Sequence, residues 1–194
     1  MAAGSPTSSR ARLSSASIVP VALELIERDG YESLSLRSLA KALGVTAPAI
    51  YDHFDSKADV LSAVAAEGYA AMDGYFVVDG SRAIERCRQR AHAYVAFAQD
   101  RPEVFRVMFL YRPRAIAIEA DNELSAASTT FEDGMADITR AIADGDLVDR
   151  DPLQINLTLW AAMHGVASIA LMAPALASDV VDDVVDAMFR GLAR

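Results

Sequence analysis

Cysteine is almost absent from the sequence, and the residues from which enzymes build their sites are sparse. The single cysteine, Cys87, excludes an internal disulfide and favours a reducing compartment, which we take to be the cytoplasm. Arginines on both sides of Cys87 are expected to lower the pKa of its thiol, but no obvious base accompanies it. The three histidines, His53, His92 and His164, are widely separated, and no glycine-rich phosphate loop is present. These features argue against an enzyme and predict neither a metal site nor a cofactor.

Aromatic residues and alternating β-branched runs are also scarce. Aromatic side chains make up 7% of the residues against 53% for all hydrophobic side chains, so the core must be aliphatic and rich in alanine. Alanine and leucine favour helix, and few runs show the strict alternation that a half-buried strand requires. The sequence therefore predicts an all-α fold of about nine helices without a sheet.

Acidic and basic side chains are unevenly distributed. Residues 1–57 carry six Lys or Arg and six Asp or Glu, whereas the whole chain has a net charge of -9. The net charge therefore lies in residues 58–194, which indicates two parts with different partners. Residues 1–13 are small, polar and basic and lack the apolar core of a signal peptide, so we expect them to form a disordered arm.

One long segment lacks charge altogether. No Asp, Glu, Lys or Arg occurs between Asp151 and Asp179, which is long enough to cross a bilayer. The segment also contains polar groups that would lack partners in lipid. The residues that disfavour a membrane span are Pro152, Gln154, Asn156, Thr158, His164, Gly165 and Pro174. We therefore expect a helix between the two prolines that is buried on most of its faces inside protein, with no membrane partner.

The N-terminal part begins with an amphipathic helix, expected over residues 14–29. Ser17 is the preferred N-cap because it places Pro20 in the first turn, where a proline is tolerated. Gly30 is expected to end this helix.

Two short helices joined by a tight turn are expected next. Ser35 caps a helix over Leu36–Leu43, and Gly44 occupies a position that favours a positive φ angle. Thr46 then caps a third helix, with Pro48 in its first turn. The small or apolar residues expected to lock the two helices together are Ala40, Val45, Ile50 and Phe54. This arrangement is a helix-turn-helix, whose second helix can enter a major groove.

The run LSLRSLAKALGVTAPAIYDHFDSKADVL resembles the DNA-binding domain of TetR-type transcriptional regulators. The resemblance covers residues 14–64 and includes the sequel Tyr-x-His-Phe, after which Ser56 opens a fourth helix. It implies a helix-turn-helix domain over residues 14–57 and a larger helical domain for ligand binding and dimerisation over residues 58–194.

The resemblance also implies which residues contact DNA. They are Ser35, Arg37, Thr46, Ala47, Pro48, Tyr51, His53 and Lys57. Tyr51 and His53 fall where this family contacts phosphate, and Lys57 begins a helix whose N–H groups can hold a phosphate. The leading end of the third helix is expected to face a base edge or a thymine methyl group. Asp52 is expected to face solvent, although it can also accept a hydrogen bond from a cytosine amino group.

The remaining chain is expected to be helical with short breaks. The predicted helices cover residues 81–99, 102–109, 119–143, 152–173 and 179–192. Trp160, His164 and Gly165 resemble the Trp-x-x-x-His-Gly signature of one subgroup of TetR C-terminal domains. The candidate ligand contacts are Tyr94, Phe105, Met108, Tyr111, Trp160, Met163 and His164. Ordinary core packing is the alternative for each of them.

Arginines and aspartates form two charged sets in this part of the chain. Arg82, Arg86 and Arg90 recur at every fourth residue and therefore share one ridge of a helix. An anion site is conceivable there, but ion pairing with acidic neighbours on the surface is favoured. The aspartates expected to form a solvated face of the last helix are Asp179, Asp182, Asp183 and Asp186.

These features together predict a homodimeric transcription factor, favoured as a repressor, that binds a double-stranded DNA operator. A small, largely apolar effector is expected to release it. The last two helices are expected to form a four-helix dimer interface that covers the charge-free segment. Two alternatives stay open: a small-molecule binding or sequestering protein with a non-functional DNA module, and an enzyme.

Overall fold

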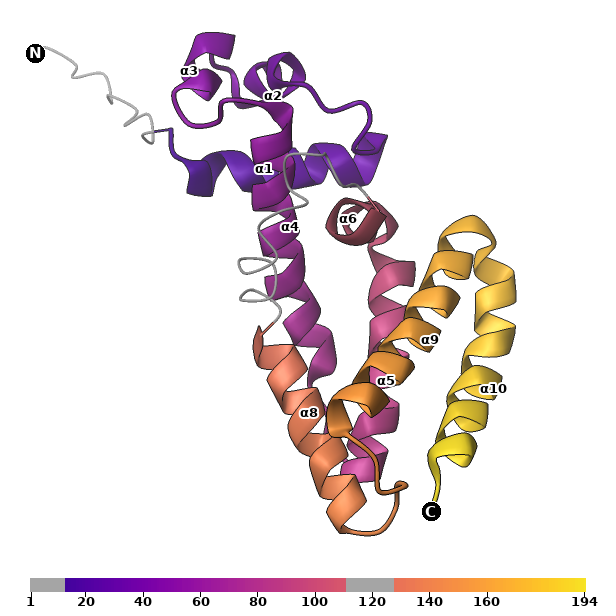
Figure 1. The fold of residues 1–194 in the computed structure, drawn as a ribbon. Helices are drawn as coiled ribbons and strands as arrows, with labels where there is room; N and C mark the ends of the chain where they lie inside the picture. The colour runs from indigo at the N-terminus through magenta and orange to yellow at the C-terminus, as the bar shows by residue number, and fades with distance from the viewer. Residues whose placement is uncertain (1–12, 111–127) are drawn as a thin grey trace, which may run out of the picture. The chain divides into compact units, whose positions relative to one another are not determined.

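The computed structural model describes residues 13–110 and 128–194. Within them lie nine α-helices, a 3-10 turn and a π-helical turn, and no strand (Figure 1). The predicted all-α fold is therefore confirmed. Residues 1–12 of the expected arm and Tyr111 lie outside the described residues. The chain divides into two compact units, Met1–Val60 and Leu61–Arg194.

The first unit contains three helices and the start of a fourth. They are α1 (Ser15–Asp29), α2 (Leu36–Leu43), α3 (Ala47–Tyr51) and α4 (Lys57–Asp73). Helix α2 contacts both α1 and α3. The core is aliphatic, as the composition predicts, and its fully buried side chains are Ile18, Ala22, Ile26, Leu39, Ile50 and Val60.

Helix α1 covers nearly the expected residues, but its N-cap is Ser14 rather than the predicted Ser17. The Ser17 hydroxyl accepts a hydrogen bond from the backbone N–H of Ser14 at 2.9 Å and donates one to the Ser14 carbonyl at 2.8 Å. Pro20 therefore lies inside the helix, beyond its first turn. The carbonyl that Pro20 leaves without an intrahelical donor belongs to Ala16, in the exposed first turn, where water can reach it.

The second unit is built around one central helix. Its elements after α4 are η1 (Gly74–Phe76), α5 (Ala83–Asp100), α6 (Pro102–Phe105), η2 (Arg106–Leu110), α8 (Ser128–Ala143), α9 (Pro152–Met172) and α10 (Pro174–Leu192). Helix α5 packs against α8, α9 and α10, and α9 and α10 run side by side (Figure 1). The predicted helix over residues 119–143 is described only from Ser128 onward.

The boundary between the last two helices differs from the prediction. Pro174 does not merely close the charge-free helix: α9 ends at Met172, and Pro174 is the first residue of α10. A proline is well suited to this position, because the first N–H groups of a helix have no intrahelical acceptor. The last helix therefore starts before Asp179, and the charge-free segment includes its first turn.

Helix α9 is also less buried than predicted. Only 33% of its most apolar stretch is buried, although it is the one described helix long and apolar enough to cross a membrane. The expectation that most of its faces are covered is wrong for a single chain, because its neighbours pack against one side. The buried side is formed by Ile155, Leu159, Met163, Val166, Ala167 and Ala170. The large apolar side chains on the exposed side are Leu153, Leu157, Trp160, Ile169 and Met172.

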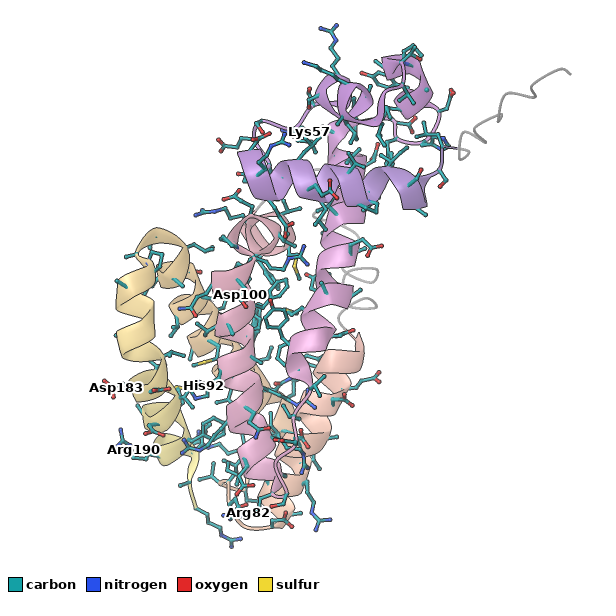
Figure 2. The ribbon with its side chains drawn as sticks, turned by 180° about the vertical axis from the view of Figure 1, so that it is seen from behind. Lys57, Arg82, His92, Asp100, Asp183 and Arg190 are labelled. Carbon is teal, nitrogen blue, oxygen red and sulfur yellow. The ribbon has the colours of Figure 1, made fainter. Side chains whose placement is uncertain are left out.

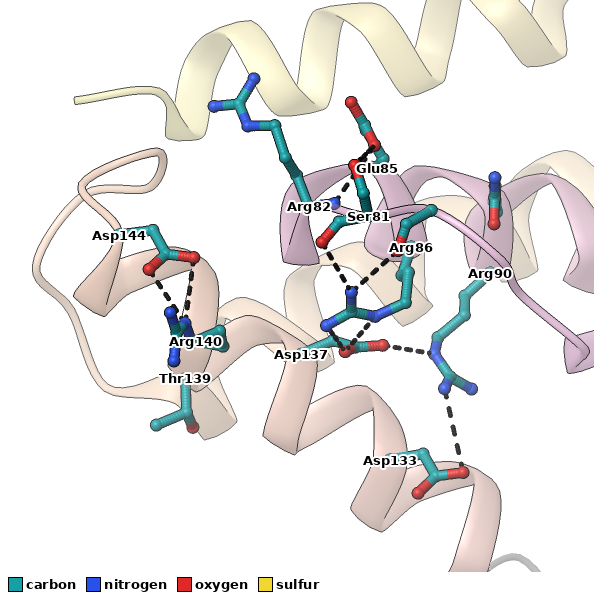
Figure 3. Close-up of polar contacts among 12 residues, drawn as sticks. Ser81, Arg82, Glu85, Arg86, Arg90, Asp133, Asp137, Thr139, Arg140 and Asp144 are labelled. Atoms are coloured by element: carbon teal, nitrogen blue, oxygen red, sulfur yellow. Dashed lines mark hydrogen bonds and ion pairs between the residues drawn. The ribbon is translucent and has the colours of Figure 1, made fainter.

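The arginine ridge of α5 pairs with aspartates, as predicted, but part of the pairing is buried (Figure 3). Asp137 of α8 is 7% exposed. Its carboxylate accepts hydrogen bonds from Arg86 Nε at 2.8 Å and from Arg90 Nε at 3.0 Å. The expected lowering of the Cys87 pKa is wrong, because burial raises the pKa of this thiol to about 12 despite the adjacent arginines.

Two aspartates of α10 are not simply solvated. Asp186 pairs with Arg88 at 2.5 Å, and Asp182 lies 3.5 Å from Nδ1 of His92. Both partners belong to α5, and Figure 2 shows His92 on the side of α5 that faces α10. The side chains of Asp182 and Asp186 are nevertheless 82% and 56% exposed, and Asp183 is exposed as well, so these three keep the expected solvent-facing position. The side chain of Asp179 lies outside the described part of the chain.

Replacing Asp137 by Asn tests the buried pairing between α5 and α8. We expect D137N to lower the midpoint of thermal unfolding by about 5 °C or more, because two arginines lose their shared carboxylate. The matched control is D144N, whose partner Arg140 has a 71% exposed side chain. The control is expected to shift the midpoint by less than about 2 °C. Thermal unfolding is monitored by circular dichroism. Equal shifts of the midpoint in the two variants would contradict a structural role specific to Asp137.

Candidate DNA-binding surface and aromatic site

Helix α2 is fixed at both ends by local hydrogen bonds. Ser35 is its N-cap: the Ser35 hydroxyl accepts from the backbone N–H of Ser38, and the Ser38 hydroxyl accepts from that of Ser35, both at 3.0 Å. At the other end Gly44 has φ 66°, a left-handed conformation that glycine adopts without a Cβ clash. The backbone N–H of Val45 then bonds to the Ala40 carbonyl at 3.0 Å. The turn into α3 is therefore tight and well defined.

Helix α3 is short and is held by apolar contacts below it. Ile50 has no exposed surface and Phe54 is 7% exposed, so one side of the helix is locked into the unit. Thr46 occupies the N-cap position, but its side chain makes no capping hydrogen bond. Its hydroxyl and methyl groups therefore stay available at the leading end of the helix.

Most residues with a predicted DNA contact lie on the surface of the first unit. The exposed ones are Ser35, Arg37, Thr46, Pro48, Tyr51 and His53, and the partly buried ones are Ala47 and Lys57. Tyr51 is 55% exposed, so its hydroxyl group is accessible at the end of α3. The neighbouring Asp52 is exposed as well. The surface thus offers hydroxyl, imidazole and guanidinium donors around a weakly charged helix.

Lys57 has a role that its sequence position did not predict. Its ammonium group donates a hydrogen bond to the backbone carbonyl of Glu32 at 2.9 Å. Partial burial lowers the pKa of this ammonium group. Lys57 therefore ties the start of α4 to the α1–α2 connection, and two of its three N–H donors are left for a further partner. The sequence pattern around Lys57 gives no indication of this hydrogen bond, because the Glu32 carbonyl belongs to a distant part of the chain.

In the second unit, three predicted ligand contacts form a hydrogen-bonded group. The hydroxyl of Tyr94 on α5 lies 2.9 Å from Nδ1 of His164 on α9. The indole N–H of Trp160 donates to the same hydroxyl oxygen at 3.3 Å. Tyr94 is 6% exposed, whereas Trp160 is 46% exposed. The group therefore extends from the core of the unit to the uncovered side of α9.

Aromatic rings surround this group. The ring centroids of Tyr94 and Phe105 are 5.7 Å apart, and those of Phe105 and His164 are 5.6 Å apart. Phe109 joins them, at 4.7 Å from Phe105 and 5.4 Å from His164. The buried methionines Met108 and Met163 were also predicted contacts. Phe109 was missed, although its spacing of four residues from Phe105 would have placed it on the same helical face.

Burial keeps the titratable members of this group uncharged. It raises the pKa of Tyr94 far above its usual value and lowers the pKa of His164. In both cases desolvation favours the neutral form of the side chain. The group therefore presents neutral hydroxyl and imidazole dipoles among aromatic rings near pH 7.

Comparison with known families assigns both units. The family of bacterial regulatory proteins described as tetR matches residues 18–64, and the tetracyclin repressor-like C-terminal domain matches residues 87–192. The chain belongs to the TetR family. It is accordingly a DNA-binding transcriptional regulator, and the resemblance found in the helix-turn-helix is confirmed. The Trp-x-x-x-His-Gly subgroup stays a prediction.

Relatives and solved structures agree with membership in the TetR family. An uncharacterized HTH-type transcriptional regulator of Mycobacterium tuberculosis is 28% identical over 92% of this chain and 78% of its own length. A protein of unknown function from Rhodococcus sp. RHA1 is 28% identical, with a TM-score of 0.78 over 97% of this chain and 100% of that one. A TetR variant from Acinetobacter baumannii AYE in complex with minocycline shares the fold, with a TM-score of 0.65, 20% identity and coverage of 93% and 96%.

The single tryptophan provides a test of the charge state of His164. The ring centroids of Trp160 and His164 are 5.4 Å apart, and a protonated imidazole quenches a nearby indole more strongly than a neutral one. We expect tryptophan fluorescence to titrate with a midpoint below the usual histidine pKa of about 6.5. The variant H164Q should abolish this titration, whereas H53Q should leave it unchanged. A midpoint above the usual value would contradict the effect of burial.

The same pKa shift predicts how stability depends on pH. The unfolded chain binds the His164 proton at a higher pH than the folded chain does. The contribution of His164 to stability is therefore complete above about pH 6.5 and decreases as the pH falls toward the folded-state pKa. The free energy of unfolding, measured with urea as a function of pH, should fall more steeply for wild type than for H164Q over this range. Parallel pH dependences of the two proteins would show that the pKa shift is absent.

Proposed function

We propose that this TetR-family regulator is a homodimeric repressor that holds its operator through α3 of both subunits. The observation that carries the proposal is the exposed leading end of α3, fixed by the turn at Gly44. Two such helices enter successive major grooves when they are presented about 34–36 Å apart. A cytoplasmic location is consistent with a DNA partner.

Different residues on this surface would contact different parts of the DNA. Tyr51 and His53 would contact phosphates, and Ser35 and Arg37 would contact the backbone or a guanine. Lys57 would add a phosphate contact while its ammonium group also holds the carbonyl of Glu32. Thr46, Ala47 and Pro48 would face base edges and thymine methyl groups. Because residues 1–57 have no net charge, their non-specific affinity for DNA would be modest, and this affinity would depend only weakly on salt concentration.

A second copy of the chain would cover the uncharged side of α9. Leu157 and Trp160 are each 46% exposed, and the helix carries no charged residue that would favour exposure of this side to water. Exposed apolar surface of this kind usually marks an interaction site. Helices α9 and α10 of two subunits would form the four-helix interface, as expected from the sequence.

An effector would act through the second unit. The aromatic rings around Tyr94, Phe105 and His164 offer an apolar surface with a few polar groups, which is typical of ligand sites. The Acinetobacter relative holds minocycline, which supports a small organic effector for this fold. Release of the operator would follow if the effector binds more tightly to a dimer whose two α3 helices are wrongly spaced.

Replacing the Tyr51 hydroxyl tests the proposed contact with DNA. We expect Y51F to weaken binding to the DNA upstream of its gene by about tenfold or more, because two phosphate hydrogen bonds are lost per dimer. The thermal midpoint should not change, since the side chain is exposed. D52N is the matched control at the C-cap of the same helix, and it should bind equally or more tightly because an anionic charge is removed. Unchanged retention of Y51F in a mobility-shift assay would contradict the contact.

The same assay separates the two candidate functions. A sequestering protein with a non-functional DNA module would fail to shift its upstream DNA while still binding a small molecule. A repressor would shift this DNA and release it when the effector is added.

A charge on the uncovered side of α9 tests the dimer. We expect L157E to sediment as a monomer at micromolar concentrations at which wild type is a dimer, because association would bury an unpaired carboxylate. V77E is the matched control, since Val77 is 84% exposed and lies outside α9. Dimerisation of L157E equal to that of V77E would exclude this face as the interface.

A further inference from the structure

We propose that His164 donates the hydrogen bond that anchors the effector, and that the effector is an uncharged molecule with a hydrocarbon body and one acceptor oxygen, such as an ester, ketone or lactone. The proposal rests on the proposed role of the second unit in binding an effector. It goes further by naming the chemical class that the residues around His164 accept and the class that they reject.

The hydrogen bonds of Tyr94 determine which nitrogen of His164 carries the proton. Trp160 can only donate, so its indole N–H uses a lone pair of the Tyr94 oxygen. Tyr94 is buried, and within residues 13–110 and 128–194 the one acceptor recorded for its hydroxyl proton is Nδ1 of His164. Nδ1 is therefore the acceptor nitrogen. In a neutral ring the proton must then be on Nε2.

The Nε2–H group is a donor that the described residues leave without a recorded partner. His164 is partly buried, and its backbone carbonyl is already occupied by the Ser168 hydroxyl at 2.7 Å. Desolvation lowers the pKa of the ring, so the ring remains neutral near pH 7. A neutral imidazole of this kind donates one hydrogen bond and cannot neutralise an anion.

The surroundings of His164 select an apolar body. Phe105 has no exposed surface, and the ring centroids of Phe105 and Phe109 lie 5.6 Å and 5.4 Å from that of the imidazole. Aromatic rings gain contact energy with aromatic or aliphatic ligands. The hydrogen-bond donor therefore lies at the edge of a hydrocarbon surface, which fits a ligand with one polar end.

Three arginines among the described residues of this unit are already engaged. Arg86 and Arg90 share Asp137. Arg106, which follows Phe105 in sequence, bonds to Glu103 at 3.1 Å and to the carbonyl of Leu171 at 2.9 Å. A carboxylate ligand beside His164 would lose its water without gaining any of these three arginines as a partner, which is costly. The site should therefore reject acids and accept the corresponding neutral esters.

Three probes with nearly the same body test this selection. They are methyl 3-phenylpropanoate, its free acid, and butylbenzene, which lacks the oxygen. Each is titrated at about pH 8, where the acid is ionised, into the full-length protein, and binding is followed by tryptophan fluorescence. We expect the ester to bind at least about tenfold more tightly than the acid and more tightly than butylbenzene. Equal or tighter binding of the acid, or no binding of the ester, would overturn the proposal.

Two variants then locate the donor. H164F replaces the imidazole by an apolar ring, and it should reduce ester affinity to that of butylbenzene while leaving butylbenzene affinity unchanged. S168A is the matched control: it removes the hydrogen bond from the Ser168 hydroxyl to the His164 carbonyl but keeps Nε2–H, so the preference for the ester over butylbenzene should persist. Equal weakening of ester and butylbenzene in H164F would indicate a packing role and overturn the proposal. If H164F does not fold, the comparison of the three probes on wild type decides.

Failure of this inference can be distinguished from failure of the proposed function. Operator retention of the ligand-free wild-type protein is measured separately by mobility shift. If the protein binds its operator but takes up the acid and not the ester, the repressor assignment stands and the ligand class is wrong. If it selects the ester but does not bind DNA, the ligand class stands and the repressor assignment is wrong.

Discussion

The left-handed backbone at Gly44 is the constraint on which the DNA-binding unit depends. It lets α2 end abruptly and α3 start within two residues, because a glycine adopts this conformation without steric cost. The caps at Ser35 and the buried side chains of Ile50 and Phe54 then fix both helices to the unit. A short helix with few charges can act as a recognition element because its backbone is held so firmly.

Helix α9 has a comparable importance in the second unit, because its two sides have different partners. One side packs into the core and brings His164 to Tyr94, while the other remains apolar and uncovered. Trp160 belongs to the uncovered side, yet its indole N–H bonds to the buried Tyr94 hydroxyl. The proposed effector site and the proposed dimer surface therefore share a side chain.

Desolvation outweighs nearby charge at the buried groups of this unit. Arginines flank Cys87 in sequence, and the charges of Arg86 and Arg90 do act to lower its pKa, but burial of the thiol raises it more. The arginines are also partly neutralised, because they share the carboxylate of Asp137. His164 follows the same rule with the opposite sign, since its charged form is the protonated one. The chemistry of these side chains is decided by burial, which a sequence does not specify.

Short-range features of the sequence determined the positions of the helices in the DNA-binding unit. The spacing of Leu36, Leu39 and Leu43, the cap at Ser35 and the glycine at 44 fix the helix-turn-helix because each acts within one or two turns of helix. They were sufficient to place the helix-turn-helix, whereas the TetR family was indicated by the resemblance of residues 14–64. The N-cap of α1 was misassigned to Ser17, because the serines at 14 and 17 offer two caps that the sequence alone does not rank.

Tertiary structure alone decided the contacts between residues far apart in the chain. The bond from Lys57 to the Glu32 carbonyl, the sharing of Asp137 by two arginines and the meeting of Tyr94 with His164 all join separate helices. Such contacts depend on how helices pack, and many packings satisfy the same apolar stripes. For the same reason the sequence showed that α9 lacks charge, but only the fold showed that one chain covers just one of its sides.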